Sequence, residues 1–479
     1  MWADRLQKQE TRLGGGVAIF LYNLAILLIL PVAVAYLAVQ LLVHRRYRES
    51  LLPRLGFLSR SLGENKRAAD LACTSAGARG ASEDPDLSSP HGTPETNSQG
   101  PVLWIHAVSV GEVVAVTPLV RRLRQCFPKG RLVVSTITET GQATARQKIP
   151  EADEFIYFPF DLRWIVGKVI RVIRPSLFVF LETEIWPNFL YALAQKGIPS
   201  VMVNGRISSR SYKGYRLVAP FFRKVLEGVR LFSVQTDLDR QRLIALGVDP
   251  SKVVKTGNMK YDQATLEISG DLIEIRKGLR LPTSCDLILA GSTHEGEEEA
   301  MASCYRSLSK KYPGVRLLLA PRHLDRIERI EGLLQRQGLK VVRRTKIDSC
   351  GFSVLPSDTV ILLDTLGELQ RLYSMASLVF VGGSLVPIGG HNVLEPAALA
   401  RPILFGPHME TYREIARLLV ERQGACQVAD TDELLDQMDR LLANPDQSTR
   451  MGMQAREVVL EQQGVVEKNL TLLRGILGD

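Results

Sequence analysis

Carboxylates stand directly after two short apolar runs of this chain, where general acid–base chemistry could use them. The run VLWIH ends at His106 and leads into AVSVGE, which closes on Glu112. A helix is expected to begin there, and its dipole would favour the ionised form of Glu112, as a general base requires. The run LFVFL is followed by Glu182 and Glu184. Glu182 could point into a cleft and Glu184 could cap the next helix, whose first turn suits Pro187. Solvated loop carboxylates are the simpler alternative.

Basic and glycine-rich loops follow other apolar runs, and they suit a phosphorylated ligand. Lys260 in TGNMKYD could reach a phosphate or carboxylate, although surface lysines are commoner. Arg322 in LLLAPRH directly follows an apolar run, and its planar guanidinium can bind a phosphate bidentately. Glu395, near the end of GGSLVPIGGHNVLEP, could accept hydrogen bonds from a ribose diol. The glycine-rich part of that loop would bring backbone N–H groups near phosphates through Gly382, Gly383, Ser384, Gly389 and Gly390.

Metal and ATPase chemistry are poorly supported by the sequence. The D-x-D patterns at 237–239 and 430–432 look like helix starts rather than metal ligands. The histidines are dispersed and the cysteines form no C-x-x-C pair, so neither a zinc site nor a disulfide framework is expected. The G-x-x-x-x-G-K-[ST] loop of many ATPases is also missing. We therefore expect a phosphate site without a metal.

Alternating apolar and amphipathic stretches must position these residues. The predicted strands are VLWIHAV, RLVVST, SLFVFLE, SVMVNG, LFSVQT and VVKTGN, followed by DLILAGST, VRLLLAP, KVVRR, VILLD, LVFVGG and PILFG. Strands that alternate with helices indicate parallel sheets covered on both faces. We predict an α/β fold of two doubly wound, Rossmann-like domains at 101–265 and 266–450, with a helical segment at 451–479. Such sheets bind ligands at the carboxyl ends of their strands, so two facing domains would share a cleft.

The N-terminal region predicts a membrane anchor. Residues 17–43 carry no charge and would form about 40 Å of helix, enough to cross an apolar layer about 30 Å thick. A cleavable signal peptide would have a shorter apolar stretch of about 7–15 residues. Residues 1–16 form a flank, and 44–100 form a basic juxtamembrane segment and a flexible tether. Arg45, Arg46 and Arg48 place the following domains on the cytoplasmic side, near anionic lipids. The formal charge of +9 also favours an anionic partner.

Ordered motifs along the chain resemble the Kdo transferases (3-deoxy-D-manno-octulosonic acid transferases) of lipopolysaccharide synthesis. They are HAVSVGE, LETEIWPN, NGRISSRS, TGNMKYD, APRH, DTLGEL and GGSLVPIGGHNVLEP. The resemblance covers the chain from the apolar segment onward, except for residues around 64–100, a tether longer than is usual in that family. It implies a GT-B fold and inverting transfer from CMP-Kdo to a lipid A precursor of the lipid IVA type. It further implies that no metal ion or other cofactor is required.

The resemblance also implies roles for individual residues. Glu112 corresponds to the catalytic base, and Glu182 and Lys260 correspond to residues that stabilise the transition state. The residues that correspond to CMP contacts are Pro321, Arg322, Gly367, Glu368, Leu369, Asn392, Val393, Leu394 and Glu395. The implied partners are CMP-Kdo, the lipid A precursor and the inner leaflet of the bacterial inner membrane, with no nucleic acid.

Two other interpretations of the sequence stay open. One is a GT-B-fold enzyme that acts on another nucleotide sugar, including an epimerase. The other is a membrane-tethered nucleotide-binding protein without catalysis. Turnover of a UDP-sugar without turnover of CMP-Kdo would favour the first, and an intact function in the Glu112→Gln variant would favour the second.

Overall fold

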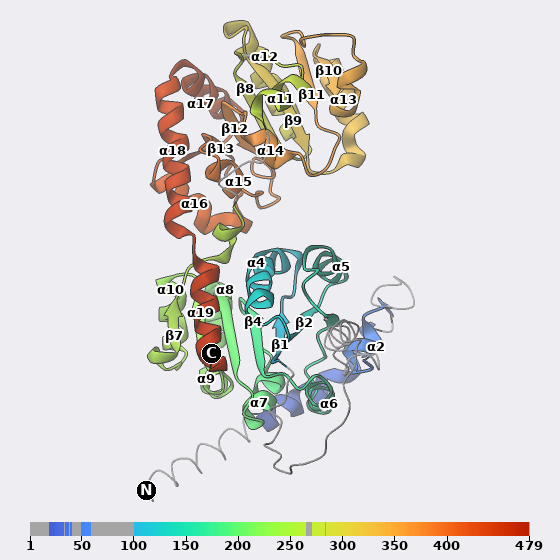
Figure 1. The fold of residues 1–479 in the computed structure, drawn as a ribbon, viewed down its shortest axis with the longest axis vertical. Helices are drawn as coiled ribbons and strands as arrows, with labels where there is room; N and C mark the ends of the chain where they lie inside the picture. Colours follow the sequence, from blue (N-terminus) through green and yellow to red (C-terminus); the bar gives the residue numbers. More distant parts are fainter. Residues whose placement is uncertain are drawn as a thin grey trace, which may run out of the picture. The chain divides into compact units, whose positions relative to one another are not determined.

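The chain divides into two compact units, each with its own parallel sheet. The computed structural model describes residues 19–32, 34–37, 39–40, 49–58, 100–264, 271–282 and 284–478. Unit 1 comprises Met1–Lys260 and Gly464–Asp479, and unit 2 comprises Tyr261–Gln463. Within the described residues each unit is built on one seven-stranded sheet (Figure 1).

The sheet of unit 1 is parallel throughout. Its strands are β1 (Val102–His106), β2 (Arg131–Thr136), β3 (Glu154–Tyr157), β4 (Leu177–Leu181), β5 (Ser200–Gly205), β6 (Leu231–Val234) and β7 (Val253–Lys255). They lie in the order β3-β2-β1-β4-β5-β6-β7, so the order reverses between β1 and β4. The loops that leave these two strands therefore meet at the point where such sheets usually bind ligands.

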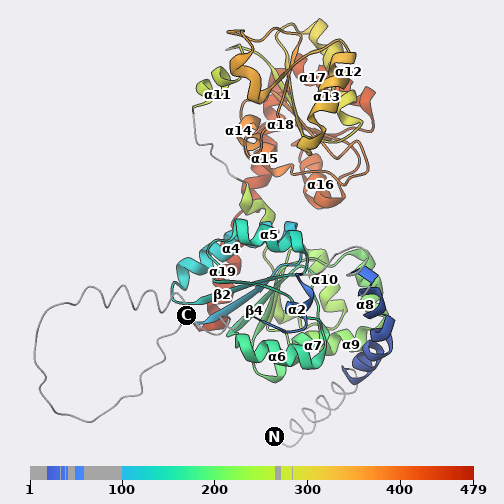
Figure 2. The ribbon, with the colours of Figure 1, turned by 90° about the vertical axis from the view of Figure 1, so that its right-hand side faces the viewer.

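Helices cover both faces of this sheet. They are α2 (Leu51–Arg54), α4 (Val110–Cys126), α5 (Glu139–Lys148), α6 (Arg163–Ile173), α7 (Pro187–Gln195), α8 (Ser209–Leu217), α9 (Ala219–Glu227), α10 (Asp237–Ala245) and α19 (Val465–Leu477), with the 3-10 turns η2 (Pro250–Lys252) and η3 (Met259–Gln263). Successive side chains of a strand point to opposite faces. Leu103 and Ile105 of β1 thus share a core with α4, α5 and α19, whereas Trp104 shares a core with α6 and α7. Figure 2 shows α6 and α7 on the face of the sheet opposite α4 and α5.

Unit 2 repeats this architecture. Its strands are β8 (Leu287–Thr293), β9 (Arg316–Pro321), β10 (Lys340–Arg343), β11 (Thr359–Leu362), β12 (Leu378–Val381), β13 (Ile403–Phe405) and β14 (Ala425–Gln427). They are parallel in the order β10-β11-β9-β8-β12-β13-β14, which reverses between β8 and β12.

The helices of unit 2 also lie on both faces of its sheet. They are α11 (Leu272–Gly278), α12 (Glu297–Lys311), α13 (Ile327–Arg336), α14 (Leu369–Tyr373), α15 (Leu394–Ala398), α16 (Arg413–Glu421), α17 (Thr431–Ala443) and α18 (Pro445–Gln462), with η4 (Leu324–Arg326), η5 (Arg344–Ser349) and η6 (Glu410–Tyr412). α12, α13 and α17 share one core with the sheet, and α14, α15, α16 and α18 share the other.

The predicted strand series agree with the structure, with two omissions. Each run predicted as a strand contains one, but β3 and β14 were not expected. The domain boundary was expected between residues 265 and 266, and the two units divide slightly earlier, after Lys260. The expected C-terminal segment at 451–479 is helical, but it is shared between the units, because α18 belongs to unit 2 and α19 to unit 1.

The described part of the N-terminal apolar segment contacts the rest of unit 1 through polar and aromatic side chains. Residues 19–32 and 34–37 are helical. Tyr22 Oη donates a hydrogen bond to Asp161 Oδ2 at 3.0 Å. The amides of Asn23 and Asn188 exchange hydrogen bonds of 2.8 and 3.0 Å. Phe221 of α9 lies beside Tyr22, with ring centroids 5.5 Å apart.

The predicted membrane-spanning anchor is not found in the structure. Among the residues that the structure describes, no helix combines the length and the apolar character that crossing a membrane requires. Parts of the predicted span, at 17–18, 33, 38 and 41–43, lie outside the described residues, as does the expected tether from 59 to 99. The prediction rested on the uncharged length of this stretch and its basic flank, whereas Tyr22 and Asn23 place polar groups in it that hydrogen-bond to Asp161 and Asn188.

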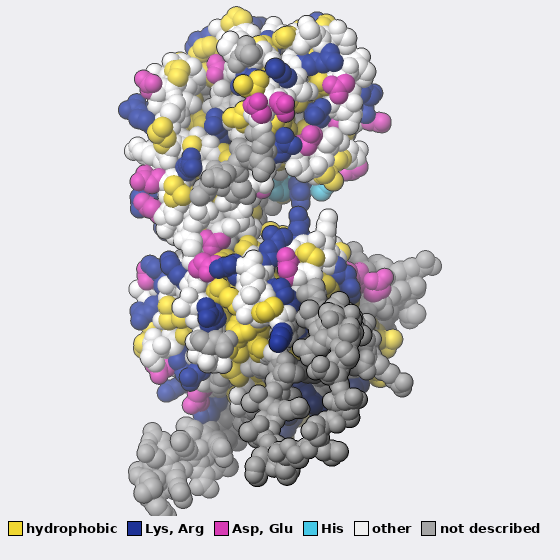
Figure 3. All heavy atoms as spheres, viewed as in Figure 1, with side chains coloured by type: hydrophobic (Ala, Val, Ile, Leu, Met, Phe, Trp, Pro, Cys, Tyr) yellow, Lys and Arg dark blue, Asp and Glu magenta, His cyan; other side chains and the backbone are white. Residues whose placement is uncertain are grey.

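The net positive charge is not gathered in one patch on the face drawn in Figure 3. Lys and Arg side chains are interspersed there with Asp and Glu over both units. The charge of +9 therefore does not by itself mark a binding surface on that face.

Candidate active site

Glu112 is a buried carboxylate held at the start of α4. Ser109 caps the helix, and its hydroxyl donates to Glu112 Oε1 at 3.0 Å. The backbone N–H of Val108 donates to Glu112 Oε2 at 2.9 Å. Burial nevertheless raises the pKa of Glu112 to about 7, the hydrogen bonds from Val108 and Ser109 oppose the rise, and the nearby Glu182 and Glu184 add to it. The donors at the helix start favour the ionised form of Glu112, but burial outweighs them. A pKa near neutrality still suits a general base.

Glu182 leaves β4 in a strained backbone conformation. Its φ is 50°, in the left-handed region that residues with a side chain rarely adopt. Burial raises the pKa of Glu182, while Lys260 and Arg206 oppose the rise. Strain of this kind persists where the surrounding structure enforces it, often at functional sites.

Glu184 does not cap the following helix, contrary to expectation. It accepts a hydrogen bond from Trp186 Nε1 at 3.1 Å, and burial raises its pKa to about 7. The N–H groups of Asn188 and Phe189 at the start of α7 instead donate to Asp161 at 2.9 and 2.8 Å. Pro187 occupies the first turn of α7 as predicted.

Lys260 lies in η3, just after β7, and is not a solvated surface lysine. Burial lowers its pKa, while Glu182 and Glu112 raise it. Two asparagines fix its backbone. Asn258 Oδ1 accepts the N–H of Lys260 at 3.0 Å, and Asn204 Oδ1 accepts the N–H of Met259 at 3.0 Å. Unit 1 thus brings Glu112, Glu182 and Lys260 into electrostatic contact at the reversal of its sheet.

A second candidate site is a pocket of about 400 Å³ in unit 2. Loops that leave β8, β9, β11 and β12 surround it. Of the predicted CMP contacts, those that line the pocket are Pro321, Arg322, Gly367, Leu369, Asn392 and Glu395. Val393 and Leu394 are instead buried in the core beneath it. Glu368 forms an ion pair with Arg344 at 3.5 Å and accepts a hydrogen bond from Thr365 Oγ1.

Asn392 and Glu395 are arranged by a tight turn at the start of α15. Asn392 Oδ1 accepts the N–H of Leu394 at 3.0 Å, and its Nδ2 donates to Glu395 Oε1 at 3.0 Å. Burial raises the pKa of Glu395, while the hydrogen bond from Asn392 opposes this. A Cβ on Gly291 would lie 2.0 Å from Tyr373 Oη, so only glycine lets that hydroxyl reach its place in the pocket wall.

The glycine-rich loop after β12 does not offer its first amides to a ligand, contrary to expectation. The buried carboxylate of Glu297 accepts the backbone N–H groups of Gly383, Ser384 and Leu385 at 2.7, 2.9 and 3.0 Å. These backbone amides therefore bind the carboxylate of Glu297 and not a ligand. Gly389 and Gly390, farther along the loop, have φ values of 106° and 74°.

Three histidines gather beside Arg322. Nε2 of His294 and Nε2 of His391 are 2.8 Å apart, so one ring donates and the other accepts. Their rings are stacked, and His323 meets His294 edge-on with centroids 5.5 Å apart. Burial lowers the pKa of His391 to about 4, and His294 and Arg322 lower it further. The sequence analysis missed this cluster, although all three residues follow predicted strands. Within the described ranges, no group of three or more His, Cys, Asp or Glu side chains is placed to hold a metal ion.

Comparison with known proteins identifies the family. The model of the family described as 3-deoxy-D-manno-octulosonic-acid transferase (kdotransferase) matches residues 86–263. The 3-deoxy-D-manno-octulosonic acid transferase of Haemophilus influenzae is 36% identical over 380 residues, which cover 78% of this chain and 87% of the relative. The chain belongs to the Kdo transferase family. The Chlamydophila psittaci member is 33% identical over 357 residues, covering 74% of this chain and 80% of the relative.

Members of the Kdo transferase family are glycosyltransferases, and the fold agrees with that class. A solved glycosyltransferase from Rickettsia africae is 14% identical, with a TM-score of 0.51, and covers 80% of this chain and 99% of its own. This likeness concerns the fold alone. The prediction of two doubly wound α/β domains is confirmed.

The D-x-D patterns of this Kdo transferase family member lie at helix starts, as predicted. Asp239 and Thr236 form a capping box at the start of α10. Asp430 caps α17 by accepting the N–H groups of Asp432 and Glu433 at 3.0 Å each. Their carboxylates thus have structural roles.

Proposed function

We propose that this Kdo transferase family member transfers Kdo from CMP-Kdo to a lipid A precursor, with inversion at the anomeric carbon. The observation that carries the proposal is the buried carboxylate of Glu112, whose pKa of about 7 suits proton transfer at neutral pH. It stands in electrostatic contact with Glu182 and Lys260, at the reversal of the sheet of unit 1.

In the proposed reaction, Glu112 accepts the proton of an acceptor hydroxyl. The acceptor oxygen attacks the anomeric carbon of Kdo from the face opposite the phosphate. The bond between that carbon and the phosphate oxygen breaks, and CMP departs with the electron pair. One carbon–oxygen bond forms as another breaks on the opposite side, so the configuration inverts.

Two neighbours support this step electrostatically. Positive charge develops on the sugar as CMP departs, and the carboxylate of Glu182 can stabilise it. Lys260 can stabilise negative charge, either on the departing phosphate or on Glu112 before the proton arrives. Lys260 lowers the pKa of Glu182, and both Glu182 and Glu112 raise the pKa of Lys260, which favours its charged form.

We assign the donor nucleotide to the pocket of unit 2. Arg322 would bind the phosphate through its guanidinium, and Glu395 would accept hydrogen bonds from the ribose hydroxyls. The first amides of the glycine-rich loop are engaged by Glu297, so we place the phosphate beside Arg322. The guanidinium of Arg322 can stabilise the phosphate charge in the role that a metal ion fills in other enzymes, which supports metal-independent transfer.

A lipid acceptor requires access to a membrane surface, and the N-terminal segment supports this. The exposed side chains of the described helical residues include Phe20, Leu21, Leu27, Leu28, Ile29 and Val32. A group of exposed apolar side chains as large as this one marks an interaction surface. We therefore place the reaction at the inner face of a bacterial inner membrane.

The proposal is tested with the purified full chain, CMP-Kdo and a tetraacylated lipid A precursor, with the product measured by mass spectrometry. We expect Kdo addition that persists in EDTA and a product linkage inverted by NMR. The Glu112→Gln variant should lose transfer at least a thousandfold while CMP binding persists. Glu274→Gln, which changes an exposed first-turn carboxylate of α11, should match the unmodified chain. Turnover of UDP-sugars without turnover of CMP-Kdo, or transfer by Glu112→Gln, would refute the proposal.

A further inference from the structure

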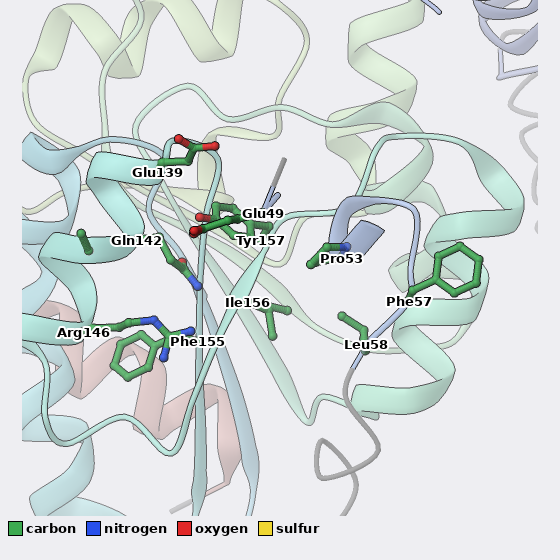
Figure 4. Close-up of a pocket in the computed structure, with 11 residues that line it drawn as sticks. Glu49, Pro53, Phe57, Leu58, Glu139, Gln142, Arg146, Phe155, Ile156 and Tyr157 are labelled. Carbon is green, nitrogen blue, oxygen red and sulfur yellow. The ribbon is translucent and has the colours of Figure 1, made fainter. Parts of the chain in front are cut away.

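A second pocket lies in unit 1, apart from the residues assigned to the reaction. It has a volume of about 420 Å³ and opens between α5, β3 and the segment 49–58 (Figure 4). Small-molecule pockets usually measure roughly 300–1,000 Å³. Glu112, Glu182 and Lys260 are not among the residues that line it.

One wall of the pocket is the segment 49–58, which comes after the N-terminal apolar region in the sequence and is attached to the rest of unit 1. The backbone N–H of Phe160 donates to the carbonyl of Arg54 at 3.0 Å, and the Arg54 guanidinium lies 4.3 Å from the centroid of the Phe160 ring. Lys168 Nζ lies 4.3 Å from the centroid of the Phe57 ring. Cation–π contacts of this kind hold the segment in place.

The pocket has a polar end and an apolar end. Glu49, Glu139 and Gln142 surround the hydroxyl-bearing ring of Tyr157 at one end (Figure 4). Burial raises the pKa of Tyr157, Glu139 and Glu49 raise it further, and Arg146 lowers it, so two carboxylates face one guanidinium around this ring. Pro53, Leu58 and Ile156 supply the apolar wall.

The charges of the lining select against a phosphate. Glu49 and Glu139 would repel an anion, and the guanidinium of Arg146 lies over the ring of Phe155, 5.3 Å from its centroid. Carboxylates accept hydrogen bonds from neutral donors such as hydroxyl and amide N–H groups. The pocket therefore suits a neutral ligand that joins such a donor to hydrocarbon.

The pocket is connected to the candidate catalytic base through one loop. Glu139, at the start of α5, follows Thr138, whose hydroxyl donates to the carbonyl of Val108 at 3.3 Å. Val108 in turn donates its N–H to Glu112 at 2.9 Å. A ligand in the pocket would thus lie at the carboxyl ends of β2 and β3, beside the β1 loop that holds Glu112.

We propose that this pocket binds one acyl chain of the acceptor lipid, with the amide or hydroxyl nearest the sugar donating to Glu49 and Glu139. The identification of the acceptor rests on the proposed function. The pocket would hold the lipid while its sugar hydroxyl extends toward Glu112, and the nucleotide would not enter it.

The first test fills the pocket from an exposed position of α5. Ala143 lines the pocket, whereas Gln147 lies on the same helix outside it. Equilibrium binding of a tetraacylated lipid A precursor, measured without donor, should weaken tenfold or more in Ala143→Trp and stay unchanged in Gln147→Trp. Both variants should keep the thermal unfolding midpoint and the circular dichroism spectrum of the unmodified chain, which verifies that unit 1 is folded. Unchanged precursor binding in Ala143→Trp would overturn the inference. Precursor binding without Kdo transfer in the unmodified chain would refute the proposed function and leave the pocket assignment standing.

The second test concerns the polar end. The double variant Glu49→Gln, Glu139→Gln should bind the precursor at least threefold more weakly, because amides are poorer acceptors than carboxylates. A pocket for the phosphate of the lipid would instead bind more tightly once both negative charges are removed. Tighter binding by this variant would therefore overturn the assignment to a neutral acyl chain.

Discussion

The carboxylate of Glu297 accepts the backbone N–H of Ser384 at 2.9 Å, although 87 positions separate the two residues in the sequence. The same side chain binds the N–H groups of Gly383, Leu385 and His294. Glu297 therefore joins the loop that leaves β8 to the loop that leaves β12, where the order of the second sheet reverses. This buried carboxylate therefore fixes the start of the loop that carries His391. The residues of that loop that line the pocket assigned to the nucleotide come later in the sequence.

Replacing Glu297 by glutamine should destabilise unit 2 and weaken binding in the pocket that we assign to the nucleotide. The amide nitrogen would face backbone donors, so at least one charge-assisted hydrogen bond worth about 1.5–3 kcal/mol would be lost. We expect the thermal unfolding midpoint to fall by about 5 °C or more and CMP affinity, measured by calorimetry, to drop. Glu299→Gln, on the exposed side of α12, is the matched control and should change neither quantity. Normal CMP affinity in Glu297→Gln would contradict this role.

The rate of transfer should depend on the ionisation of Glu112. A general base acts in its deprotonated form, and burial raises the pKa of Glu112 to about 7. We expect kcat/KM to reach half of its plateau near pH 7 and to fall about tenfold for each further unit below it. The profile is measured with the donor and acceptor at fixed low concentrations. A half-maximal rate near pH 4.5 would exclude Glu112 as the base.

The same carboxyl should make stability depend on pH with a defined sign. Its pKa is about 7 in the folded chain and near 4.5 in the unfolded chain, so the folded state retains the proton between these values. The associated stability is fully present below about pH 4.5 and is lost as the pH rises through 7. Glutamine cannot ionise, so its stability does not change in this way. When the pH is raised from 4 to 8, the free energy of unfolding of Glu112→Gln should therefore increase relative to that of the unmodified chain by on the order of 3 kcal/mol. Thermal melts at both pH values measure it, and an equal difference at both would contradict it.

Two glutamates of unit 2 should differ in their effect on the nucleotide. Glu395 lines the pocket, whereas Glu368 does not and pairs with Arg344 instead. A hydrogen bond to a charged acceptor contributes about 1.5–3 kcal/mol, so Glu395→Gln should weaken CMP binding about tenfold or more. Glu368→Gln should stay within about twofold. Calorimetric titration with CMP compares them, and equal effects would remove Glu395 from the proposed ribose contact.

Strand prediction succeeded where helices bury both faces of a strand and failed at two edges. β4 and β9 read as continuous apolar runs because all their side chains are buried. β3 and β14 lie at the edges of their sheets and span only EFIY and ACQ. Edge strands have a neighbour on one side alone, so their sequences need not be apolar throughout. Such short, partly polar strands carry little periodic signal.

The candidate site residues predicted from the sequence lie between the end of a strand and the first turn of the next helix. This position identified Glu112, Glu182 and Arg322, because the carboxyl ends of parallel strands meet at one edge of a sheet. It could also have indicated Glu297, which closes THEGE shortly after β8. The sequence could not indicate that Glu297 binds amides of a distant loop, or that Gly291 makes room for the Tyr373 hydroxyl. Those contacts depend on which strands become neighbours.

The return of α19 to unit 1 has a consequence for how the chain matures during synthesis. Val465, Leu470 and Leu473 are buried in the core formed by β1, β2 and α4, and Arg122 of α4 pairs with Glu467 at 2.5 Å. Unit 2 is continuous in sequence and lies entirely before α19. The core around Glu112 therefore receives its last apolar layer only after the whole of unit 2 has been synthesised, so a chain that stops before α19 would lack part of that core.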